Sequence, residues 1–119
     1  MVAKVISGKN IRGLLNYNEN KVNEGVAQCI AASRFGCDPL MLTFSDKLNR
    51  FRKATALNPK VRTNAIHISL NFDVTEKLTN EQLHTIASDY MTRIGFGEQP
   101  YLVYRHTDAA HPHVPVSYT

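Results

Sequence analysis

Apolar and polar residues alternate most regularly between positions 64 and 72. Every second position from Ile66 to Phe72 is apolar, and the positions between them are small or polar, His67 among them. Successive side chains of a β-strand point to opposite faces, so this period predicts a strand with one face over a core. The polar opposite face is typical of an antiparallel sheet and makes His67 a candidate site residue.

Residues 2–7 also alternate and end in turn-forming residues, which predicts a first strand. The apolar run at 101–105 predicts a strand that delivers His106 to a polar loop. A second strand returning through His113 would bring these two histidines side by side.

Two segments in the first half of the chain have the spacing of amphipathic helices. The first, 11–17, is short and is followed by a polar stretch, so Tyr17 is expected where a helix gives way to a loop. The second starts at Asp38 and Pro39, because an aspartate can cap a helix and proline fits its first position. Its apolar stripe consists of Met41, Phe44, Leu48 and Phe51.

A third helix is predicted to begin at Thr79, which forms a capping box with Gln82, and to end near Gly95 or Gly97. Residues 22–37 have weak periodicity and predict no element. The order is therefore strand, helix, helix, strand, helix, strand, loop, strand. This order predicts an α+β fold, an antiparallel β-sheet with its helices on one face.

Length and composition predict a single domain, 1–119. Its 43% hydrophobic and 20% charged residues are typical of a globular protein. Cys29 and Cys37 have no pairing pattern, and no signal or membrane segment is evident, so a reduced, cytoplasmic protein is expected. The net charge of +4 favours a polyanionic partner such as nucleic acid. On the second helix, three basic residues are either a solvated face or a track for phosphates: Lys47, Arg50 and Lys53.

Candidate chemistry is concentrated at 106–113, where three of the five histidines and one aspartate lie within eight residues. Neutral imidazole is the commonest side-chain metal ligand, and a nearby carboxylate can orient it. A metal site is one reading of this segment. An exposed polar loop that is rich in histidine is the other.

Three stretches together resemble the relaxase/mobilization nucleases of plasmids and mobilizable transposons, of the Bacteroides type. The stretches are 14–19 (LLNYNE), 67–72 (HISLNF) and 105–114 (RHTDAAHPHV). The resemblance covers nearly the whole chain in order and spacing, and the final stretch is its specific part. It implies a His-hydrophobic-His endonuclease with an antiparallel sheet flanked by helices.

The resemblance also implies roles for individual residues. Tyr17 matches the nucleophile that cuts single-stranded origin-of-transfer DNA and remains joined to its 5′ phosphate. His106 matches the first ligand of a divalent metal, Mg²⁺ or Mn²⁺, and His113 with Val114 begins the His-hydrophobic-His pair. Asp108 matches an acidic residue that orients a ligand. Relaxosome accessory proteins, and a role in conjugation, are implied as well.

Pro115 departs from this pattern, because the family has its third histidine ligand there. The divergence of 115–119 resembles a truncation or frameshift, so the domain is expected to be incomplete. In one outcome His111 takes the missing place and forms a site with His106 and His113. In the other the metal site is lost, and the chain is a non-catalytic single-stranded DNA-binding or accessory remnant of a relaxase.

Overall fold

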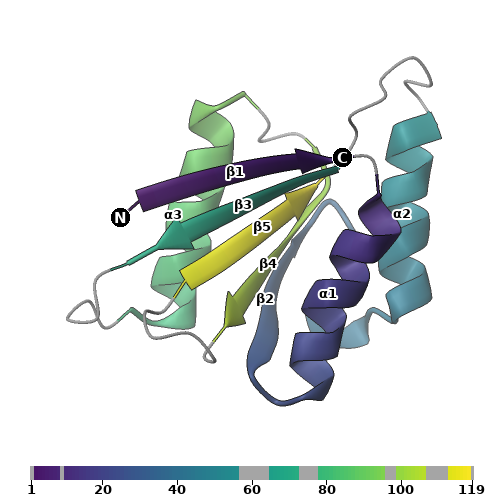
Figure 1. Cartoon of the computed structure of the whole chain (residues 1–119), viewed down its shortest axis with the longest axis horizontal. Helices are drawn as coiled ribbons and strands as arrows, with labels where there is room; N and C mark the ends of the chain where they lie inside the picture. Colours follow the sequence, from purple (N-terminus) through teal and green to yellow (C-terminus); the bar gives the residue numbers. More distant parts are fainter. Residues whose placement is uncertain are drawn as a thin grey trace.

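Five strands form one antiparallel sheet in the order β1-β3-β5-β4-β2 (Figure 1). The computed structural model describes residues 2–8, 10–56, 65–72, 78–95, 99–106 and 113–118. Its strands are β1 (Val2–Gly8), β2 (Ala27–Ser33), β3 (Ala65–Asn71), β4 (Tyr101–His106) and β5 (His113–Tyr118). All four neighbouring pairs are antiparallel. The expected α+β fold, an antiparallel sheet flanked by helices, is confirmed.

β2 lies in the stretch where the sequence predicted no element, and this is a correction. It pairs with β4 at the edge of the sheet, and its register shifts between Cys29 and Ala31. An extra residue in one strand breaks the two-residue alternation, so the sequence shows no clean strand period there. Pairing with β4 and burial of Ala31 stabilise the strand instead.

α1 (Ile11–Asn23) is longer than the predicted 11–17, so Tyr17 lies inside the helix and not at its end. The side chain of Asn10 caps it, with the Gly13 amide donating to Oδ1 at 2.9 Å. The polar stretch after Tyr17 stays helical because some of its side chains face solvent while Asn18 is buried and hydrogen-bonded.

α2 (Phe44–Ala56) begins later than the predicted Asp38, after a short 3-10 turn at Pro39–Met41. Its N-terminal amides are satisfied by a reciprocal pair in which Thr43 and Asp46 each bond the other's backbone N–H. Met41 is 73% exposed and so does not belong to the apolar stripe, whereas the Leu48 and Phe51 positions are buried.

α3 (Asn80–Arg93) has the capping box that the sequence predicted between Thr79 and Gln82. Gln82 N–H donates to Thr79 Oγ1 at 3.1 Å, and Thr79 N–H donates to Gln82 Oε1 at 2.8 Å. Gly95, with φ of +86°, follows the end of the helix, as expected for a glycine after a C-cap. Gly97 lies outside the described residues. No helix in the described part of the chain could cross a membrane.

Helices cover both faces of the sheet, which corrects the expectation of one face. In β4, Tyr104 and His106 bond to side chains of α1, while Arg105 between them bonds Asn80 of α3 at 2.9 Å. Alternate residues of a strand point to opposite faces, so α1 and α3 lie on opposite sides. Figure 1 shows α1 and α2 lying together, apart from α3.

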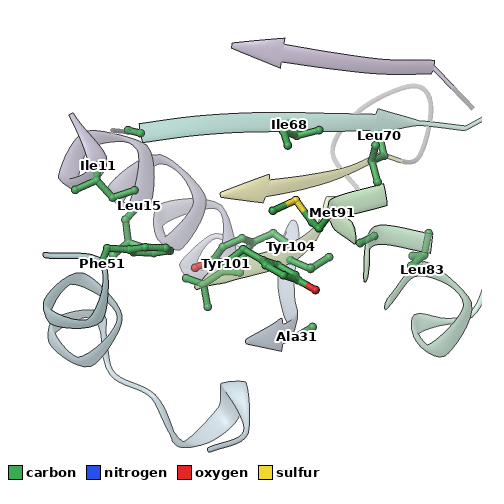
Figure 2. Packing of buried hydrophobic residues seen from close by; sticks show 14 of the residues in the cluster. Ile11, Leu15, Ala31, Phe51, Ile68, Leu70, Leu83, Met91, Tyr101 and Tyr104 are labelled. Atoms are coloured by element: carbon green, nitrogen blue, oxygen red, sulfur yellow. The ribbon is translucent and has the colours of Figure 1, made fainter. Parts of the chain in front are cut away.

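The core is accordingly divided between the two faces (Figure 2). On the α1 face Leu15 points toward Phe51 of α2, and on the other face Met91 of α3 points toward Ile68 of β3. All four side chains are fully buried. The strand predicted over 64–72 is confirmed as β3, with its apolar face on this second half of the core.

Candidate active site

α1 presents Tyr17 over one face of the sheet, with about half of its side chain in solvent. Ile11, Leu15 and Asn18 recur at helical spacing and form the buried side of the helix. Tyr17 follows on an adjacent side and keeps 52% of its surface exposed. A helix anchored through its buried side therefore presents this phenol from a rigid element rather than from a loop.

The Tyr17 ring lies against two imidazoles from two different strands. Its centroid is 6.3 Å from that of His106 on β4, with the rings inclined by 22° in a stacked arrangement. It is 6.5 Å from that of His67 on β3, edge to face at 61°. Both distances fall in the range of attractive aromatic pairs. The Lys21 ammonium, 5.8 Å from the ring centroid, adds a positive charge beside the phenol.

His106 is held by a hydrogen bond that also assigns its protonated nitrogen. The residue is 2% exposed, and its Nε2 lies 3.1 Å from Oδ1 of Asn18. The Asn18 amide nitrogen donates to the Leu14 carbonyl at 3.2 Å, which turns Oδ1 toward the imidazole. An amide oxygen can only accept, so Nε2 carries the hydrogen, and the neutral ring has its lone pair on Nδ1.

β5 places His113 opposite one residue on each of its two neighbouring strands. His113 is the backbone pairing partner of His106 on β4 and of Asn71 on β3. The predicted pairing of a strand ending at His106 with a returning strand through His113 is therefore confirmed, and the connection between them lies outside the described residues. Pro115 pairs with Ser69 of β3. Asp108 and His111, which the sequence also singled out, lie outside the described residues.

The family model of the MobA/VirD2-like relaxase nuclease domain matches residues 17–118 of this chain. This span begins at Tyr17 and includes His106 and His113. The chain belongs to this relaxase family. Searches of curated proteins and of solved structures gave no significant match.

Relaxase nuclease domains generally use a divalent metal, and the donor set of this relaxase fits one in part. His106 and His113 occupy paired positions on adjacent strands, which two ligands of one ion can do. Pro115, at the position where the resemblance predicts a third ligand, offers only its backbone carbonyl as a donor atom. Within the described ranges, no three His, Cys, Asp or Glu side chains gather as a metal site would need.

Four buried or partly buried polar residues on this face of the sheet form contacts that sequence reasoning did not predict. They are Asn18, Glu19, Lys47 and Tyr104, all within hydrogen-bond contact of one another or of His106. Asn18 had a detectable signal, because it continues the Ile11 and Leu15 spacing on the apolar side of the helix. Glu19 and Tyr104 had none, since each is bonded to a residue far away in the sequence.

The basic residues of α2 do not form one face toward a phosphate track, and this corrects an expectation. Lys47 is 4% exposed and points into the protein, where it pairs with Glu19. Arg50 donates to the Arg34 carbonyl at 2.8 Å. Lys53 remains exposed. The apolar stripe and Lys47 share the buried side because a lysine's long stem can be covered when its ammonium finds a partner.

Proposed function

We propose that this domain nicks single-stranded origin-of-transfer DNA by transesterification, with Tyr17 as the nucleophile. The observation that carries the proposal is the stacking of the Tyr17 ring on His106 at 6.3 Å. A candidate nucleophile and a candidate metal ligand from opposite ends of the chain thus lie in one place. Membership of the relaxase family and a net charge of +4 support a DNA substrate.

In the proposed reaction the Tyr17 oxygen forms a bond to phosphorus, and the bond from phosphorus to the 3′ oxygen breaks. The products are a 5′-phosphotyrosine and a free 3′-hydroxyl, so the bond energy is kept for rejoining. The 52% exposure of Tyr17 leaves room for a strand to reach it. The Lys21 ammonium near the phenol ring favours approach of the anionic backbone.

A divalent cation, Mg²⁺ or Mn²⁺, would be held by His106 and His113, with His111 in place of the missing ligand. When bound, it supplies positive charge that stabilises the phosphate oxygens of the scissile group. Asp108 would orient one of these histidines from the second shell. Relaxosome accessory proteins are the proposed protein partners of the DNA complex.

A second candidate is a non-catalytic single-stranded DNA-binding module on the same scaffold. Pro115 favours it, because the loss of one ligand lowers metal affinity. Both functions predict DNA binding that weakens steeply with salt, since phosphate contacts release counterions. They differ in whether a covalent product forms.

The test is a covalent-adduct assay with single-stranded origin DNA and Mn²⁺, on the wild type and Tyr17→Phe. We expect a DNA adduct in the wild type and none in the variant. Tyr17→Phe removes the hydroxyl of a half-exposed side chain and should change the unfolding free energy by no more than about 0.5 kcal/mol. Tyr90→Phe, on α3 at the opposite face, is the matched control and should keep the adduct.

An adduct that survives Tyr17→Phe would assign the nucleophile to another tyrosine and overturn the proposal. Salt-sensitive DNA binding with no adduct under any metal would identify the non-catalytic module. Weak, salt-insensitive DNA binding would contradict both functions.

A further inference from the structure

Three polar side chains, one each from α1, α2 and β4, form a largely buried hydrogen-bonded cluster. The Glu19 carboxylate of α1 accepts a hydrogen bond from Lys47 Nζ of α2 at 2.9 Å through Oε1. It accepts a second from the Tyr104 hydroxyl of β4 at 3.0 Å through Oε2. The Lys47 ammonium also lies 5.6 Å from the Tyr104 ring centroid. Both Glu19 carboxylate oxygens and the Lys47 ammonium are thus engaged in hydrogen bonds of this cluster.

Burial makes this cluster geometrically demanding. The Lys47 side chain is 5% exposed, the Glu19 side chain 17%, and Tyr104 fully buried. A buried ion pair loses much of its Coulomb gain to desolvation, so it is a weak source of stability compared with apolar packing of the same volume. Its directional bonds, however, fix where the three elements can lie relative to one another.

The cluster and the neighbouring Asn18–His106 hydrogen bond together set the register of α1 on β4. Glu19 bonds Tyr104, and the preceding residue Asn18 bonds His106, two positions further along the strand. Consecutive helix residues are thus tied to alternate strand residues of one face. A shift of α1 by one residue would turn the helix by about 100° and break both bonds.

Tyr17 precedes these two anchors directly, and its ring stacks on the same His106. From this geometry we infer that Glu19, with Lys47 and Tyr104, positions Tyr17 over His106. These three are positioning residues, because they act through the placement of α1 on β4. The inference rests on the proposed function for its catalytic meaning, but the positioning itself can be measured without catalysis.

The experiment compares the nuclear Overhauser effect between the Tyr17 and His106 rings in the wild type and in variants. Tyr104→Phe removes one hydroxyl and keeps the ion pair, so it should fold. The double variant Glu19→Gln/Lys47→Met removes both charges without leaving one unpaired. Thr79→Ala is the matched control, because it removes the cap of α3 and destabilises the domain from the opposite face.

We expect Tyr104→Phe and the double variant to weaken the Tyr17–His106 effect while the domain stays folded, and Thr79→Ala to leave it intact. Where the wild type nicks DNA, the two cluster changes should lower kcat roughly 10- to 100-fold with KM unchanged, as a small misplacement of a reacting group does. An intact ring contact in Tyr104→Phe, or an equal loss in Thr79→Ala, would overturn the inference. Failure of the wild type to nick would overturn the proposed function and leave the ring measurement decisive for positioning.

Discussion

Asn18 shows how one buried amide serves both the helix and the site. It is fully buried, its Nδ2 donates to the Leu14 carbonyl, and its Oδ1 accepts from His106 Nε2. A buried polar side chain is tolerated when its donors and acceptors are satisfied, and here the satisfaction also orients an imidazole. The residue thus links the fold of α1 to the direction in which His106 presents Nδ1.

Asn18→Ala should therefore destabilise the domain by about 1–3 kcal/mol, because it leaves the buried Nε2–H of His106 without this acceptor. Urea unfolding measures the change. Asn16→Ala, an exposed asparagine on the same helix, is the control and should cost no more than about 0.5 kcal/mol. Equal effects of the two substitutions would show that the His106 bond contributes nothing.

Cys29 and Cys37 should differ in reactivity because their surroundings differ. Burial is the main cause that raises the Cys29 pKa from 9.0 to about 11, and the Glu19 carboxylate acts in the same direction, against Lys47. Cys37 is exposed. A raised pKa keeps the thiol protonated, and thiolate is the reactive form.

At pH 8, iodoacetamide should therefore modify Cys37 first and leave Cys29 protected in the folded protein, as peptide mapping would show. The same shift predicts that stability falls as pH rises from 9 toward 11, because the unfolded thiol loses its proton first. Rapid modification of Cys29 at pH 8 under folding conditions would contradict this account of its burial.

At the scale of elements, the helix termini are set by local sequence. Thr79 and Gln82 satisfy each other's backbone donors, so the start of α3 was predictable from four consecutive residues. Thr79→Ala should cost about 1 kcal/mol of unfolding free energy in urea titrations. Thr85→Ala, at an exposed position of the same helix, should have a smaller effect. A neutral Thr79→Ala would mean that the capping box does not contribute to stability.

Other elements depend on contacts that the sequence pattern does not contain. β3 was predictable because its alternation is unbroken, whereas the shift between Cys29 and Ala31 hides β2. α1 extends beyond Tyr17 because Asn18 and Glu19 find partners on β4. Those partners lie far along the chain. From the sequence alone, the polar residues in the second half of α1 therefore resemble the start of a loop.

At the scale of the whole molecule, the sheet order brings distant motifs together. β5 lies between β3 and β4, so His113 pairs with Asn71 of β3 on one side and with His106 of β4 on the other. The strand-and-return pattern predicted this pairing. It did not predict that α1 would lie over the same face, because the side on which a helix packs depends on both halves of the core. In the sequence, only the family resemblance assigns Tyr17 and His106 to one site. The fold places their rings in contact.

The most direct test of the account is a Mn²⁺ titration followed by nuclear magnetic resonance, because bound Mn²⁺ broadens the signals of nearby nuclei. We expect the His106 and Tyr17 ring signals to broaden together, well before those of Tyr90 on the opposite face. Pro115→His should lower the Mn²⁺ concentration required. Equal broadening of Tyr90, or none of His106 and Tyr17 at saturating Mn²⁺, would contradict the claim that metal and nucleophile share one site.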